Sequence, residues 1–466
     1  MNKTREIIIM GFSALLLSAA SFAETPNNMQ VWLKNGERQT FEINQVDSVT
    51  FGETPIGDFK PLNEWTFLPE STEPSPLSFS DEQKAYVLTG NSFAKQTFSL
   101  ICQSDKHKDG NVFYSPISLQ IALGLCANGA TDAGAEQIAQ VFGFQGENAM
   151  DDMNEYFNSI ILSLNSSIDS ITFKVNNAMW PIMGAKVKEP FLNVAREQYY
   201  ATVRHLDYVK APKAAKDTID HWAALMTNDC IKELSIVIDP LTTLVINNAC
   251  YFKGGWNLKI EEALTKKDSF TTITGEKQII DMMHTSEPYS YAQTDDYQMV
   301  ELNYGHGTEE NPRLSNRGMG TYSMVIVLPA EGKNLDETMA SINWDNISMQ
   351  RDLVDLGFPR FGIKSAISLK DEVSKMGIND IFSVYPFSTN TPSFINEIVQ
   401  DTYIKVDEEG TEAAAVTSIV AAGEAMPMDP QEMTVNRPFG FVIREKTTGM
   451  LLFMGKVTKV EEVSKD

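Results

Sequence analysis

The residues of greatest chemical interest form one run near the C-terminus, Glu408-Glu409-Gly410-Thr411 followed by Glu412-Ala413-Ala414-Ala415. Successive side chains of a strand point to opposite faces. From Thr411 onward, one face then carries no charge and, apart from Ile419, only small residues, while Glu412 places the only charge on the other face. Such a segment can slide into a sheet with its uncharged face on a core, and Gly410 supplies the backbone freedom of a hinge. We therefore predict a hinge for strand insertion.

The same run has a second interpretation. Thr411 can cap a helix over residues 412–416, because alanine and glutamate are good helix formers. The run alone does not decide between strand and helix, so the decision rests on the elements around it.

Composition and the N-terminus limit the class of protein. The 466 residues suffice for one large or two medium domains, and a formal charge of -24 argues against a nucleic-acid partner. Lys3 and Arg5 precede an apolar stretch that ends in Ser21-Phe22-Ala23, the pattern of a secretory signal cleaved after Ala23. No cysteine lies near that site, and no later apolar run reaches the ~20 residues of a membrane helix. We expect an exported protein, secreted or periplasmic, without a lipid anchor or transmembrane segment.

The chain is predicted to divide into four parts. Residues 1–23 are the signal peptide, and residues 24–51 form a β-hairpin extension around Asn35-Gly36. Residues 52–78 are a linker rich in proline, and residues 79–466 form the main domain, in which strand-like and helical segments alternate. Strands are predicted at 172–175, 244–252 and 322–329. The four cysteines lack CxxC spacing and favour buried thiols, with one disulfide left open.

No catalytic motif is evident. The chain has five histidines and lacks the Gly-x-Ser-x-Gly, HExxH and Walker A patterns. We therefore expect no enzyme activity and neither a cofactor nor a metal.

Five motifs in order make residues from about 79 to 460 resemble the serpin family. They are the hinge run and the segments at 111–118, 248–256, 436–441 and 453–457. The resemblance implies an α+β serpin fold, with several helices around a large central β-sheet, smaller sheets and an exposed reactive loop. It places Ser115, Ser118 and Asn248 in the shutter beneath the sheet and Trp256 in the breach where insertion begins.

Two residues depart from the family pattern. Gln400 stands where the family usually has a shutter histidine, which argues against a pH-sensitive shutter, although glutamine both donates and accepts hydrogen bonds. Gly440 replaces an apolar residue of the closing signature, and we expect it to loosen a packing contact at most.

The function implied by the resemblance is that of a monomeric serine-protease inhibitor acting as a suicide substrate. Counting from the hinge places the reactive bond at Glu424-Ala425, with Ala422 and Met426 as alternatives because the loop is about three residues longer than usual. Small apolar neighbours suit an elastase-like or subtilisin-like target. The alternative is a non-inhibitory serpin that acts as a binding, carrier or surface-interaction protein.

Overall fold

The computed structural model describes residues 28–32, 38–42, 79–168, 171–239, 241–305, 322–411 and 429–461. The chain divides into two units, Met1–Phe67 and Leu68–Asp466. In the first unit, β1 (Asn28–Trp32) pairs antiparallel with β2 (Arg38–Glu42). These strands flank Asn35-Gly36, the dipeptide that predicts a hairpin.

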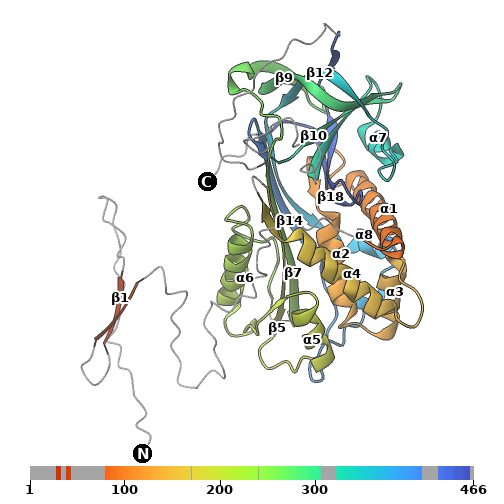
Figure 1. The fold of residues 1–466 in the computed structure, drawn as a ribbon. Coiled ribbons are helices and arrows are strands. Elements are labelled where there is room, and N and C mark those ends of the chain that lie inside the picture. The colour runs from red at the N-terminus through yellow and green to blue at the C-terminus, as the bar shows by residue number, and fades with distance from the viewer. Residues whose placement is uncertain are drawn as a thin grey trace, which may run out of the picture. The chain divides into compact units, whose positions relative to one another are not determined.

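Eight α-helices belong to the described part of the second unit (Figure 1). They are α1 (Asp81–Gln103), α2 (Pro116–Ala127), α3 (Asp132–Val141), α4 (Ala149–Leu164), α5 (Glu189–Glu197), α6 (Pro212–Met226), α7 (Leu335–Ser341) and α8 (Lys370–Lys375). None of the helices in the described ranges is long and apolar enough to cross a membrane.

The central sheet has seven strands among the described residues. Its order is β13 (Phe361–Ser368), β14 (Val399–Asp407), β15 (Gly410–Thr411), β7 (Leu244–Gly255), β5 (Ile171–Pro181) and β4 (Ser166–Ile168), with β6 (Thr202–Val203) beside β5. Figure 1 shows α6 along one face of this sheet, with α2 and α4 on the opposite side. This arrangement leaves the two-residue strand β15 between two long strands.

A second sheet has nine strands within the described ranges. Its order is β16 (Gln431–Thr434), β12 (Gln350–Pro359), β9 (Lys277–Gln293), β10 (Tyr297–Asn303), β11 (Tyr322–Pro329), β17 (Phe439–Glu445), β18 (Leu451–Val457) and β3 (Val112–Tyr114), with β8 (Lys266–Thr271) beside β9. The strands predicted at 172–175, 244–252 and 322–329 lie within β5, β7 and β11.

Helix α2 is the buried support of the central sheet. Ser115 is its N-cap and accepts a hydrogen bond from the backbone of Ser118, while Pro116 occupies the first turn, where a missing N–H is tolerated. All its residues except Ala122 are buried, as expected of a helix that is apolar on every side. Its first turn therefore sits at a fixed place beneath the sheet.

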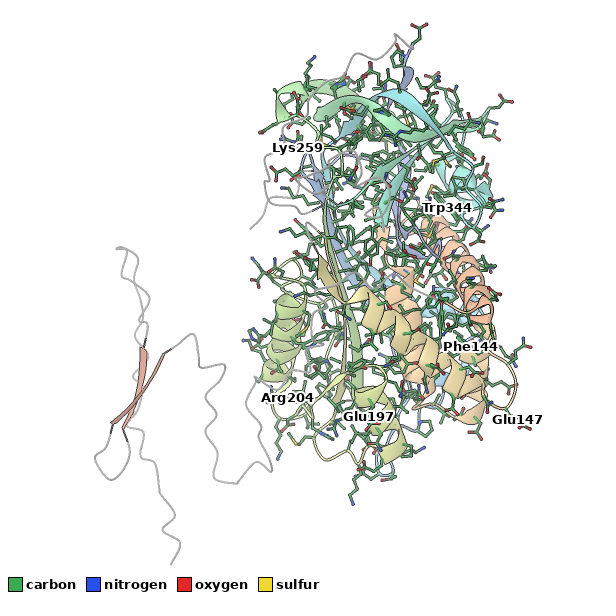
Figure 2. All side chains as sticks on the ribbon, in the orientation of Figure 1. Phe144, Glu147, Glu197, Arg204, Lys259 and Trp344 are labelled. Atoms are coloured by element: carbon green, nitrogen blue, oxygen red, sulfur yellow. The ribbon has the colours of Figure 1, made fainter. Side chains whose placement is uncertain are left out.

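The core is continuous around these elements. Side chains fill the space between the sheets and the helices, and Phe144 and Trp344 are 1% and 2% exposed (Figure 2). The four cysteines all lie in the described residues and form no disulfide; Cys102 and Cys126 are buried, whereas Cys230 and Cys250 are half-buried. The expectation of four buried thiols is thus correct for only two of them.

Candidate functional site

The hinge residues Gly410 and Thr411 form strand β15 at one end of the central sheet. Thr411 pairs with Val406 of β14 and Gly254 of β7, and both pairings are antiparallel. The side chain is 2% exposed, and its hydroxyl lies 2.7 Å from that of Tyr304. Thr411 therefore faces the core, while β14 and β7, both antiparallel to β15, run parallel to each other.

Position 410 requires glycine because the backbone of Gly254 lies close to it. Its φ is +144°, and a Cβ atom there would lie 2.0 Å from the carbonyl oxygen of Gly254. Neither the conformation nor the space suits any other residue. The glycine thus lets the chain turn from β14 into β15 against the end of β7.

Trp256 holds the turn that precedes β15. Its indole Nε1–H donates to the carbonyl of Asp407 at 2.9 Å, and its backbone N–H donates to the carbonyl of Glu409 at 2.9 Å. The buried ring stacks on Tyr304 with ring centres 4.7 Å apart. Trp256 and Tyr304 therefore fix both the backbone before the hinge and the side chain of Thr411.

Glu408 ties the start of the hinge to the second sheet. Its carboxylate is 5% exposed and accepts from Nε of Arg360 at 2.9 and 2.7 Å and from the Thr265 hydroxyl. Burial raises the pKa of Glu408, but the hydrogen bonds from Arg360 and Thr265 outweigh it and leave the pKa below its usual value. At pH values above the ordinary carboxyl pKa, the ionised Glu408 therefore stabilises the hinge. This contribution is lost as the pH falls through the lowered pKa.

Below Thr411, no strand pairing among the described residues joins β7 to β14, and we term this stretch of the sheet the insertion slot. It lies between residues 244–253 of β7 and residues 399–405 of β14, which no described strand joins. A void of about 10 Å³ lies directly beneath Thr411, between Phe252 and Ile404. A larger cavity of about 780 Å³ follows, bounded by the first residues of both strands and by α2.

Gln400 of β14 and Ser115 at the start of α2 are joined by two hydrogen bonds beside the larger cavity. The Gln400 amide accepts from the backbone N–H of Ser115 at 2.8 Å and donates to its carbonyl at 2.9 Å. The Ser115 hydroxyl donates to the carbonyl of Leu452 at 2.9 Å. The glutamine thus uses both halves of its amide to fasten β14 to the start of α2.

Asn248 lies on the other side of the larger cavity. Its amide donates to Oδ1 of Asn177 at 2.7 Å, and its own buried Oδ1 has no hydrogen-bond partner among the described residues. Ser118, Asn248 and Gln400 all line this cavity. The structure therefore brings Ser115, Ser118 and Gln400 together and leaves Asn248 facing them across the slot.

The remaining sequence-predicted residues lie outside the described part of the chain. They are the hinge residues Glu412, Ala413, Ala414 and Ala415 and the reactive-bond candidates Ala422, Glu424, Ala425 and Met426.

Sequence reasoning missed the partners of the hinge and the side chain that packs on Gly440. Arg360, Thr265 and Tyr304 carry no local motif that connects them with residues 408–411. At Gly440, a Cβ atom would lie 2.3 Å from the sulfur of Met339, so the thioether occupies the space that a side chain would fill. Packing at Gly440 is therefore not loosened, which lies within the limit expected for this position.

Comparisons with known proteins agree on one family. Residues 89–460 match the family model described as Serpin (serine protease inhibitor). A serpin-like protein of Methanosarcina acetivorans is 33% identical over 79% of this chain and 86% of its own length. Human serpin B4 is 29% identical over 78% of this chain and 97% of its own length.

Solved structures agree on the fold. The thermophilic serpin tengpin in its native state gives a TM-score of 0.70 at 23% identity, covering 84% of this chain and 97% of tengpin. Human thyroxine-binding globulin complexed with thyroxine gives a TM-score of 0.71 at 23% identity, covering 82% of this chain and 100% of that protein. The predicted α+β fold and the family resemblance are confirmed.

We predict that Arg360→Ala destabilises the hinge. It would leave the Glu408 carboxylate buried without its main partner, so the free energy of unfolding should fall by about 2–3 kcal/mol at neutral pH. The loss should shrink as Glu408 is protonated at lower pH. Urea unfolding at several pH values measures both effects.

The control is Glu262→Gln, since Glu262 contacts the same guanidinium at 3.5 Å but its side chain is 85% exposed. It should change stability by less than about 0.5 kcal/mol. Equal losses for the two variants would contradict the role assigned to Glu408.

Gly410→Ala should expel β15 from the sheet because of its contact with Gly254. We expect a loss of about 1–3 kcal/mol and faster proteolysis around residues 407–411. Gly110→Ala is the control, since the nearest atom to its added Cβ lies 4.0 Å away. Equal resistance of the two variants to proteolysis would contradict the placement of Gly410 in the sheet against Gly254.

Proposed function

The chain belongs to the serpin family, and on that premise we propose that it inhibits serine proteases as a suicide substrate. The observation that carries the proposal is the seating of Gly410 and Thr411 between β14 and β7 above the insertion slot. Residues 412–428 would be offered to a protease as substrate, and their cleaved N-terminal part would then enter the slot as a full strand.

The covalent step belongs to the protease. Its serine attacks the carbonyl carbon of Glu424, the C–N bond to Ala425 breaks, and the new amine leaves with a proton from the protease histidine. The serine then holds the loop as an ester. Insertion carries the attached protease along and distorts its active site before water can hydrolyse that ester.

The register of β15 supports a specific alignment for the proposed inserted state, obtained by continuing its pairing beyond Thr411. Continued beyond Thr411, it brings Glu412 beside Lys253 and Lys405 on the outward face. It brings Thr417 between Asn248 and Gln400 on the inward face, where the threonine hydroxyl can donate to the unpartnered Oδ1 of Asn248. Because the inward residues Ala413 and Ala415 have small side chains, insertion can be faster than hydrolysis of the ester.

Several finer features belong to the same proposal. Small apolar residues around Glu424 favour an elastase-like or subtilisin-like protease, and the absence of Lys and Arg between Glu412 and Glu432 argues against a trypsin-like one. The N-terminal pattern ending at Ala23 supports export. We expect the inhibitor to act as a monomer.

The proposal is tested by incubating the protein with elastase, subtilisin, chymotrypsin and trypsin. We expect an SDS-stable complex with one of the first two and a released peptide that begins at Ala425. A peptide beginning at Gly423 or Pro427 would move the reactive bond to Ala422 or Met426. Cleavage by all without any complex would overturn inhibition in favour of a non-inhibitory binding or carrier protein.

We predict that Thr411→Arg abolishes inhibition and leaves a folded protein. Thr411 is already buried in β15, so an unpaired guanidinium at this core-facing position should expel β15 from the sheet and leave the loop without the seated residue from which insertion would continue. The variant should be cleaved as an ordinary substrate. Glu412→Ala is the outward-facing control and should still trap protease; trapping by Thr411→Arg at the wild-type stoichiometry would show that Thr411 is not the inward hinge residue.

A further inference from the structure

We propose that the cavity of about 780 Å³ in the insertion slot binds a neutral amphiphile, a molecule with an alkyl chain and a hydroxyl head, such as a long-chain alcohol. We term this cavity the amphiphile site. Its volume lies within the range of ~300–1,000 Å³ that is usual for small-molecule sites. The bound ligand would compete with the inserting strand, and this second part rests on the proposed function.

The walls of the amphiphile site are largely apolar. They come from α2, from the start of β7 and from the segment before β14, which contribute Leu119, Leu123, Leu244, Ile246, Ile395 and Ile398. Ala122 also lines the site and is the one residue of α2 that is not buried. An alkyl chain can therefore lie against α2 and the two flanking segments.

The end of the amphiphile site nearest Thr411 is polar and uncharged. Asn248 and Gln400 are the lining residues of β7 and β14 that come closest to Thr411 along those strands, and Ser118 of α2 lines the site as well. Both halves of the Gln400 amide bind the backbone of Ser115.

The Asn248 amide is the group that a ligand can satisfy. Its nitrogen donates to Asn177, whereas its buried Oδ1 has no hydrogen-bond partner among the described residues. Because a buried acceptor without a donor is unfavourable, a hydroxyl head that donates to this oxygen would contribute to binding.

The charges of the lining select a neutral head group. Of the described residues that line the site, only Asp239 and Glu397 are charged, and both are exposed. A fatty-acid carboxylate would therefore meet two like charges and no lysine or arginine among these lining residues. An alcohol avoids that repulsion.

Exposed apolar side chains continue the lining toward solvent. Val237 and Leu241 are each 86% exposed and Phe394 is 55% exposed, and all three line the amphiphile site. Large apolar side chains that are exposed together are typical of interaction surfaces. The far end of the alkyl chain would cover them and remove their surface from water.

The ligand and the inserting strand would need the same space. In the proposed inserted state, the register of β15 places Thr417 beside Asn248 and Ile419 beside Ile246. The hydroxyl head would bind the acceptor that Thr417 uses, and the alkyl chain would occupy the place of Ile419. A bound ligand should therefore slow insertion and divert inhibitor into the cleaved, uncomplexed form.

The test uses the full-length protein and 1-decanol as the probe, with decanoate as the matched ligand of equal chain length. In isothermal titration calorimetry, we expect one decanol to bind per chain and decanoate to bind at least about tenfold more weakly. Decanol should also raise the melting temperature, since it binds the folded state. Failure of decanol to bind would overturn the site, and equal affinities would overturn the assigned head group.

Two variants locate the binding. Ala122→Phe places a large side chain in the amphiphile site and should weaken decanol binding at least about tenfold. Ala133→Phe adds the same side chain at an exposed position of α3 and should bind decanol like the wild type. With both folded, as checked by thermal unfolding, equal affinity of the two variants for decanol would overturn the location of the site.

A third variant decides the location even if Ala122→Phe does not fold. Leu241→Ser changes an exposed side chain, so the core is not disturbed, and it removes an apolar contact of the alkyl chain. Decanol should bind this variant about threefold to tenfold more weakly. Unchanged affinity would contradict the placement of the chain.

The ratio of trapped complex to cleaved inhibitor tests the competition. At a decanol concentration about ten times its Kd, the ratio should fall by up to about tenfold, because only ligand-free protein can insert its loop. Decanoate at the same concentration should leave the ratio unchanged. Binding without any change in the ratio would overturn the competition with the loop. If the protein trapped no protease even without ligand, the proposed function would fail, while calorimetry would still decide whether the site binds the alcohol.

Discussion

The seating of a two-residue strand between two long parallel strands is the constraint on which the rest of the site depends. Gly410 and Thr411 complete the sheet for two residues, and β7 and β14 then continue without a described strand between them. Neighbouring strands that no third strand joins can accept an added strand of suitable register. Among the described strands, β15 lies at the end of this stretch, so the occupant that we propose for it is the segment that follows Thr411.

Three sets of contacts surround the site at which the proposed insertion would occur. Arg360 and Trp256 hold the turn before β15, Gln400 fastens β14 to Ser115, and Ser235 binds Asp401 over the slot. In the proposed mechanism the first set would present the hinge, whereas the other two would restrain β14 during insertion. A serpin whose shutter uses a glutamine amide relies on neutral hydrogen bonds there, because the side chain does not titrate.

The fold and the hinge could be predicted from the sequence because both follow from local patterns. The alternation along the run from Thr411 predicts that the Thr411 side chain points inward, and the strand-like run at 244–252 predicts β7. The partners of these elements could not be predicted. Glu408 and Arg360 are 48 residues apart, and Ser235 and Asp401 are 166 residues apart, so their contacts depend on how two sheets and the segment between α6 and β7 pack. The Met339 sulfur beside Gly440 is a similar case, since it depends on where α7 crosses β17.

The most direct test of the account compares the thermal stability of intact protein with that of protein nicked once within residues 422–428. Insertion of the freed strand would pair both edges of the slot and bury its uncharged face, so the nicked protein should melt at a markedly higher temperature. Most proteins lose stability when their chain is cut. Nicked protein that melted at or below the temperature of the intact protein would contradict inhibition by strand insertion.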